Sequence, residues 1–208
     1  MAKIFQVSAR AGMTRVVEPV ARGLLRSGVS PNAVTVAGTV GVLIGAIGFG
    51  ARGHLVAGAL IVTLFALTDL LDGTMARMRG GATKFGAFLD SSMDRVADGA
   101  IFGSVTYWLA TQGDSWGVVA AVICLVAGQV VSYVKARAEG LGMTCNVGLA
   151  ERTERLIAVG VGALLSAVVD WGLTAALWVL AVLSVITVGQ RIAHVHRQAQ
   201  RAEMGVDA

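Results

Sequence analysis

Apolar side chains fill six long stretches of the chain, and short polar segments separate them. The stretches cover residues 31–50, 55–78, 85–111, 116–138, 152–169 and 173–195. A helix of about 20 residues crosses the hydrocarbon core of a bilayer, so the stretches match the length of membrane spans. The pattern predicts an all-α integral membrane protein with six transmembrane helices in a single domain over residues 1–208, with residues 31–195 forming the bundle.

The stretch over residues 85–111 differs from the others because its first half is charged. It carries Asp90, Asp94, Arg95 and Asp98. Charged side chains are costly in lipid, so we expect this half to face the bundle interior or the cytosolic boundary. Arg95 and Asp98 are three residues apart, and we expect them to pair on the helix surface.

The segment over residues 3–26 mixes apolar and basic side chains before the first span. This mixture is typical of an amphipathic helix that lies in the membrane interface. A signal peptide is the alternative, but the basic segment is long and the apolar run after it has no convincing small-residue cleavage site. We therefore predict an N-terminal interfacial helix.

Basic residues alternate in density from one connection to the next. They are dense before residue 31, between the second and third stretches, between the fourth and fifth, and after the sixth, whereas the other connections are poor in them. Six spans with both termini in the cytosol satisfy the positive-inside rule at every loop. The net charge of +4 is not interleaved with aromatic residues, so we expect contact with lipid headgroups or phosphorylated substrates and no nucleic acid.

Small residues are frequent, with 27 glycines in 208 residues. Gly38, Gly41, Gly45 and Gly48 share one face of the first predicted span. Such faces let helix backbones approach closely, so we expect tight helix packing there.

Four aspartates carry the candidate chemistry. Asp69 and Asp72 share one helix face, and Asp90 and Asp94 share another. A short basic loop joins the two helices, so they should run antiparallel and bring the four carboxylates together near the cytosolic end. Clustered carboxylates repel one another, and divalent cations such as Mg²⁺, Mn²⁺ or Ca²⁺ remove that repulsion. A pair of ions is therefore predicted for phosphoryl-group transfer.

Small and basic residues accompany the aspartates. Gly73 and Gly86 leave room for a bulky ligand at the helix backbones, and Arg77 lies about one turn beyond Asp72, where it can meet a phosphate.

The stretch from Asp69 to Asp94 matches the signature of the CDP-alcohol phosphatidyltransferase family, D-x2-D-G-x2-A-R-x8-G-x3-D-x3-D, at all eight fixed positions. The chain resembles this family in its six-helix layout as well. The resemblance implies that Asp69, Asp72, Asp90 and Asp94 hold two metal ions, Mg²⁺ or possible Mn²⁺, and that Asp94 also acts as the catalytic base on the acceptor hydroxyl.

The resemblance further implies a CDP-diacylglycerol site. Gly73, Arg77 and Thr83 match donor-contacting positions or adjoin them. Family members also carry a Pro-Asn-x-x-Thr segment before the first span, and Pro31, Asn32, Ala33, Val34 and Thr35 match it here. The same segment is typical of a helix start capped by Ser30, and both roles can hold.

The acceptor is predicted from basic residues on the same cytosolic side. Arg155 and Arg191 fall inside helix ends, where an unpaired arginine is costly unless it faces a cavity. We hypothesise that Lys135, Arg155 and Arg191 bind the phosphate of the acceptor. The sequence is most similar to actinobacterial family members that use inositol phosphate and make phosphatidylinositol phosphate, which implies a bacterial inner-membrane enzyme and a homodimer.

Two alternatives stay open from the sequence. Glycerol 3-phosphate carries the same phosphate, so a phosphatidylglycerol phosphate synthase would suit the basic residues equally. Acids buried among six helices also occur in ion-coupled transporters, although these acids gather at one end and no internal repeat is evident.

Overall fold

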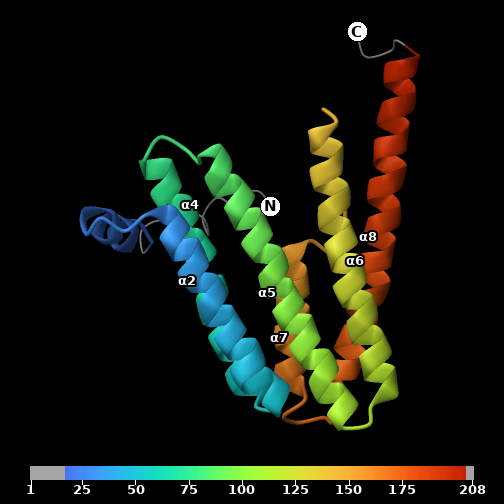
Figure 1. Ribbon diagram of the computed structural model, residues 1–208. Helices are drawn as coiled ribbons and strands as arrows, with labels where there is room; N and C mark the ends of the chain where they lie inside the picture. The colour runs from blue at the N-terminus through green and yellow to red at the C-terminus, as the bar shows by residue number, and fades with distance from the viewer. Residues whose placement is uncertain (1–16, 205–208) are drawn as a thin grey trace, which may run out of the picture.

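The computed structural model describes residues 17–204, and every regular element in that range is a helix. A helix over residues 17–26 comes first. It is followed by α2 (Pro31–Leu43), the π turn η1 (Ile44–Phe49), the 3₁₀ turn η2 (Gly50–Arg52), α3 (Leu55–Ala66), α4 (Thr68–Met78), α5 (Lys84–Thr111), α6 (Ser115–Gly140), α7 (Arg152–Leu165) and α8 (Gly172–Glu203). Figure 1 shows them as a bundle of helices of unequal length.

Four segments are long and apolar enough to cross a membrane: Pro31–Arg52, Leu55–Met78, Ser115–Gly140 and Gly172–Glu203. They coincide with four of the six predicted spans. Of the other two, α5 is charged in its first half, and α7 has only 14 residues. At 1.5 Å per residue α7 is about 21 Å long, which is shorter than the hydrocarbon core of a typical bilayer.

The first turn of α2 confirms its predicted start. The hydroxyl of Ser30 accepts a hydrogen bond from the Ala33 N–H at 3.1 Å, and Pro31 takes the first helical position, where a missing N–H costs nothing. At the other end the span changes to a π turn and a 3₁₀ turn before the chain reverses at Gly53, whose φ of +84° suits glycine.

Glycines on α2 bring it against the next span, as predicted. A Cβ added at Gly41 would lie 2.1 Å from the Phe65 ring, and one added at Gly38 would lie 2.0 Å from the Thr68 hydroxyl. Neither side chain could stay where it is, so both glycines are needed for this packing.

Two clusters of buried apolar residues hold the bundle together. The larger one joins α2, α3, α5, α6, α7 and α8 around side chains such as Phe102 and Leu177. The smaller one packs Ala21, in the helix over residues 17–26, against Val34 and Met75. Residues 17–26 thus supply the described part of the predicted interfacial helix 3–26, and residues 3–16 lie outside the described range.

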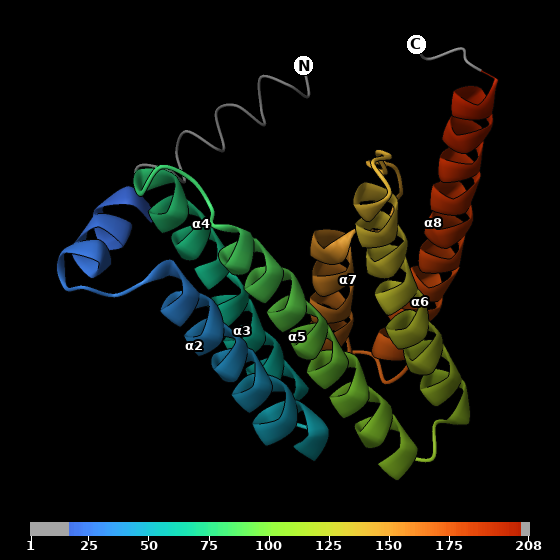
Figure 2. The same cartoon turned by 45° about the horizontal axis from the view of Figure 1, so that its top comes forward.

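The helices fall into two groups with α7 between them (Figures 1 and 2). On one side α2 packs against α3, α4 and α5, and on the other α6 packs against α8. The two groups are connected by α5, which packs against α6, and by α7, which contacts both α3 and α8. In Figure 1 its first turn lies well below the upper ends of α6 and α8.

Candidate active site

Three of the four predicted metal-binding aspartates converge. Asp69 lies in the first turn of α4, Asp72 one turn later, and Asp90 in the second turn of α5. Carboxylate oxygens from these three residues lie within 4.8 Å of one another. A set of oxygen ligands at this spacing fits a hard divalent cation such as Mg²⁺ or Mn²⁺, which would offset the repulsion between the carboxylates.

Thr35 of α2 orients the carboxylate of Asp72 through a hydrogen bond. Its hydroxyl is hydrogen-bonded to Asp72 Oδ2 at 2.6 Å, and both side chains are buried. This bond connects the Pro-Asn-x-x-Thr segment with the aspartate signature. Because α2 packs against both α4 and α5, it fixes the separation of the two helices that carry the acids.

The start of α5 lies against the start of α2. Thr83 caps α5 by accepting a hydrogen bond from the Gly86 N–H at 2.9 Å. A Cβ added at Gly86 would lie 3.2 Å from Asn32 Oδ1, so the glycine lets Asn32 approach the α5 backbone. On α4, Arg77 donates to the Thr74 hydroxyl at 2.9 Å, and a Cβ at Gly73 would meet only the Arg77 side chain, at 3.5 Å. The predicted donor-binding residues Gly73, Arg77 and Thr83 therefore lie on or next to the two helices that carry the aspartates, and Asn32 lies against the start of α5.

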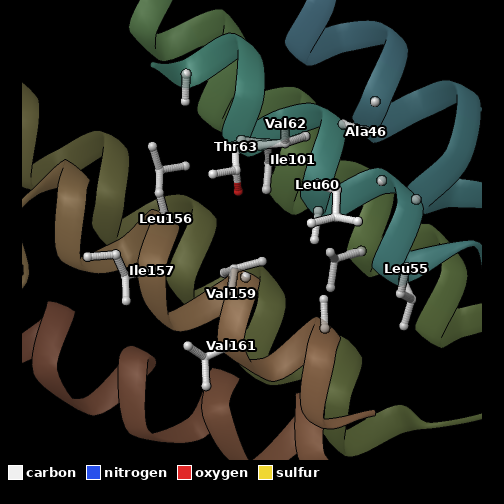
Figure 3. A pocket seen from close by; sticks show the side chains of 18 of the residues that line it. Ala46, Leu55, Leu60, Val62, Thr63, Ile101, Leu156, Ile157, Val159 and Val161 are labelled. Atoms are coloured by element: carbon white, nitrogen blue, oxygen red, sulfur yellow. The ribbon is translucent and has the colours of Figure 1, made fainter. Parts of the chain in front are cut away.

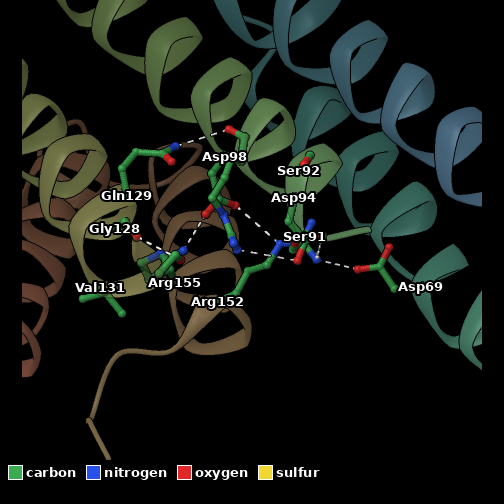
Figure 4. Close-up of polar contacts among 12 residues, drawn as sticks. Asp69, Ser91, Ser92, Asp94, Asp98, Gly128, Gln129, Val131, Arg152 and Arg155 are labelled. Atoms are coloured by element: carbon green, nitrogen blue, oxygen red, sulfur yellow. Dashed lines mark hydrogen bonds and ion pairs between the residues drawn. The ribbon is translucent and has the colours of Figure 1, made fainter. Parts of the chain in front are cut away.

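Asp94 lies next to an arginine rather than within the group of three (Figure 4). Arg152, the first residue of α7, pairs through Nη1 with Asp94 Oδ1 at 2.8 Å and with Asp69 Oδ2. A weaker pair forms between Asp94 and Arg95 at 3.7 Å. These contacts of Arg152 were not predicted from the sequence.

Asp98 was predicted to pair with Arg95 on the helix surface, but the structure pairs it with a different arginine. It is 3% exposed and forms an ion pair with Arg155 of α7, which is 1% exposed (Figure 4). The prediction was wrong because it considered only neighbours on the same helix, whereas α7 approaches this face of α5. Gly128 of α6 makes room for the arginine, since a Cβ there would lie 3.1 Å from Arg155 Nε.

The three predicted acceptor ligands differ in their surroundings. Arg155 is engaged by Asp98, as described. Arg191 of α8, 3% exposed, donates to the Val147 and Val131 carbonyls at 2.8 and 2.7 Å and to Glu151 Oε1 at 3.0 Å. Lys135 is partly exposed near the end of α6.

Arg191 and Thr187 fasten the connection between α6 and α7 onto α8. The Thr187 hydroxyl accepts from the N–H groups of Leu149 and Ala150 at 3.1 and 3.0 Å. Further along, Gln198 bonds to both backbone groups of Thr144. This connection, residues 141–151, ends at Glu151, so its attachment to α8 sets the position of Arg152.

An apolar groove leads away from the aspartates between α3 and α7 (Figure 3). Its volume is about 520 Å³, and Asp69 and Arg152 are its charged lining residues. The remaining lining comes mainly from side chains such as Leu60, Ile101 and Leu156. A polar site and an apolar groove are thus continuous, as a ligand with a charged head and hydrocarbon tails would require.

Comparison with known proteins agrees with this geometry. Phosphatidylinositol phosphate synthase of Mycobacterium marinum is 50% identical over 189 residues, covering 88% of this chain and 81% of that protein. The crystal structure of the Mycobacterium tuberculosis phosphatidylinositol phosphate synthase with CDP-DAG bound matches with a TM-score of 0.84 at 47% identity, covering 87% of this chain and 94% of that one. The same enzyme in complex with manganese and citrate matches with a TM-score of 0.83 at 47% identity, over 86% and 88% of the two chains.

The profile of the CDP-alcohol phosphatidyltransferase family matches residues 28–188, which include the four aspartates, the Pro-Asn-x-x-Thr segment and all of α7. This match covers more than half of the chain, and it makes the transporter alternative untenable. The chain belongs to the CDP-alcohol phosphatidyltransferase family.

Proposed function

We propose that the protein transfers the phosphatidyl group of CDP-diacylglycerol to inositol phosphate, giving phosphatidylinositol phosphate and CMP. The observation that carries this proposal is the convergence of Asp69, Asp72 and Asp90 beside an apolar groove, in a chain about half identical to phosphatidylinositol phosphate synthases. The carboxylates suit a pyrophosphate with its cations, and the groove suits acyl chains.

The donor would lie across the site. Its cytidine and pyrophosphate would contact Pro31, Asn32, Ala33 and Val34 at the start of α2 and Gly73, Arg77 and Thr83 around the aspartates. The N-terminus of α2 favours an anion because the helix dipole places partial positive charge there. The acyl chains would follow the groove between α3 and α7, where nearly all lining side chains are apolar.

The chemistry would be an in-line displacement at phosphorus. When bound, two divalent ions, Mg²⁺ or Mn²⁺, held by Asp69, Asp72, Asp90 and Asp94 would neutralise the pyrophosphate and the leaving CMP. Asp94 would accept the proton of the acceptor hydroxyl, and the hydroxyl oxygen would attack the phosphorus of the phosphatidyl group. The phosphorus–oxygen bond to CMP then breaks.

The acceptor site is proposed to include Lys135, Arg155 and Arg191. These residues belong to α6, α7 and α8; Arg155 lies in the first turn of α7, and Arg191 is bonded to Glu151, which precedes that turn. Because Arg155 and Arg191 already contact protein groups, binding of a phosphate through them would require an exchange of partners.

The membrane arrangement is proposed as six spans in a single domain, with α5 and α7 joining the four apolar ones. Positive charge in the connections supports a bacterial inner-membrane location with both termini and the active site in the cytosol. Reporter fusions at each connection would test this topology. The predicted homodimer rests on the family resemblance, and cross-linking in native membranes would test it.

An acceptor panel tests the function. Purified protein with CDP-diacylglycerol and Mg²⁺ should release CMP with inositol phosphate and much less with glycerol 3-phosphate, serine or free inositol. Asp94→Asn should abolish release. The matched control is Asp170→Asn, in the exposed connection between α7 and α8 at the opposite end of the bundle. Preference for glycerol 3-phosphate would refute the proposed acceptor, and an active Asp94→Asn variant would refute the proposed base.

A further inference from the structure

Arg152 is the cation of the candidate active site. Its guanidinium pairs with Asp69 from α4 and with Asp94 from α5, and its Nε lies 3.5 Å from Asp98 Oδ1 (Figure 4). The side chain is 20% exposed, so the carboxylates rather than water provide most of its surroundings. One arginine thus bridges two helices whose acids would otherwise repel each other.

Without these carboxylates, the position of Arg152 would be electrostatically unfavourable. It is the first residue of α7, and the N-terminus of a helix carries partial positive charge, which disfavours a cation there. A purely structural arginine would be better placed at the other end of the helix. The surrounding acids compensate for this cost, so the placement of Arg152 depends on them.

A second partner is available to the same side chain. Within the described residues, the buried Arg152 Nε and the buried Asp98 Oδ1 both have no hydrogen-bond partner. They lie 3.5 Å apart, just beyond a good hydrogen bond. A small rotation of the guanidinium toward Asp98 would satisfy both atoms and release the carboxylates of Asp69 and Asp94.

We propose that Arg152 acts as a built-in counter-cation that competes with divalent metal for Asp69 and Asp94, and that it turns toward Asp98 when metal binds. This inference rests on the metal site of the proposed function. It concerns a residue outside the aspartate signature.

The balance of charge in the site indicates which of the two metal ions Arg152 opposes more strongly. Asp69, Asp72, Asp90 and Asp94 together carry four negative charges, and Arg152 carries one positive charge. A first dication still leaves net negative charge in the site, so Arg152 can stay. A second dication balances the four acids alone, and Arg152 would then be repelled. The second, weaker binding event should therefore oppose Arg152 most strongly.

Manganese binding to the purified, EDTA-treated protein in detergent, without substrates, tests the proposal. Free Mn²⁺ is measured by electron paramagnetic resonance during titration of the wild type and of Arg152→Gln. We expect the variant to bind the weaker Mn²⁺ about tenfold more tightly, because a positive charge a few ångströms away opposes a dication even in water. Arg79→Gln, at the exposed end of α4, is the control for net charge and should match the wild type.

The outcomes separate this inference from the proposed function. Equal or weaker Mn²⁺ binding by Arg152→Gln, with binding intact in the wild type, would overturn the competition and leave the metal site standing. No Mn²⁺ binding by either protein would overturn both. A purely structural arginine predicts weaker binding on its removal, so the direction of the change decides the question.

Thermal unfolding gives a second measurement if Arg152→Gln folds poorly. Without metal the variant should melt below the wild type, because the acids lose their counter-cation, whereas saturating Mn²⁺ should raise its melting temperature by more than that of the wild type. Arg152→Lys keeps the charge and should respond like the wild type. Equal Mn²⁺-induced shifts in Arg152→Gln and the wild type would contradict the proposal.

Discussion

The buried pair between Asp98 and Arg155 allows a sharp test of how α7 is held. Asp98→Asn leaves the arginine without a carboxylate partner, since Asp98 is its one ion-pair partner among the described residues. Arg155→Gln instead leaves Asp98 buried with only the more distant Arg152 nearby. The double variant removes both charges and keeps two amides that can hydrogen-bond to each other.

The expected losses in the free energy of unfolding follow from the burial of Asp98 and Arg155. The two side chains are 1% and 4% exposed, so the loss of one partner leaves an uncompensated charge away from water. Such changes cost about 3–5 kcal/mol. We expect Asp98→Asn near the upper end and Arg155→Gln near the lower end, because Arg152 partly compensates the remaining Asp98. For a chain of this size, these losses lower the melting temperature by about 6–20 °C.

The assay is thermal unfolding in one detergent, combined with KM for inositol phosphate. The double variant should lose about 2 kcal/mol less than the sum of the two single losses, and this difference is the coupling energy of the pair. If Arg155 also binds the acceptor phosphate, KM stays high in the double variant although stability returns. Additive losses in the double variant, or shifts below about 2 °C in the singles, would refute the importance of this pair.

Three further substitutions test packing and positioning. Gly58→Ala should lower stability by about 1–3 kcal/mol in thermal unfolding, because its Cβ would lie 3.0 Å from two backbone atoms, whereas Gly99→Ala, with open space, should not. Thr35→Val should slow CMP release about tenfold through the lost bond to Asp72, a loss of about 1.4 kcal/mol, and an unchanged rate would contradict this. Arg191→Lys should lower the melting temperature and raise KM for inositol phosphate, because an ammonium cannot replace a guanidinium that contacts three acceptors; an unchanged KM would contradict a phosphate ligand at this position.

Much of the fold and part of the site could be predicted because the relevant signals are local. Helix ranges follow from apolar runs, and all six predicted spans begin within one residue of the start of a helix in the structure. The convergence of Asp69, Asp72 and Asp90 follows from their spacing on two helices joined by a short loop. Both inferences require only helical periodicity and chain connectivity.

The contacts of α7 could not be predicted in the same way. Arg152 and Asp69 are 83 residues apart, and Arg155 and Asp98 are 57 apart, so their meeting depends on how α7 packs between α3 and α8. One local signal was available: Arg152 and Arg155 lie on the same face at a helix N-terminus, where cations are disfavoured. Two arginines in such a place indicate acidic partners elsewhere in the fold.

The connection over residues 141–151 has a mechanical consequence. It is bonded to α8 at Gln198, Arg191 and Thr187, which span 11 residues and therefore about 16 Å along the helix axis. The positions of these three residues along α8 therefore determine how deep in the bundle α7 begins, and with it the depth of Arg152. A one-residue insertion in α8 between Thr187 and Arg191 would rotate these attachments out of register by about 100° and shift Arg152 relative to Asp69 and Asp94.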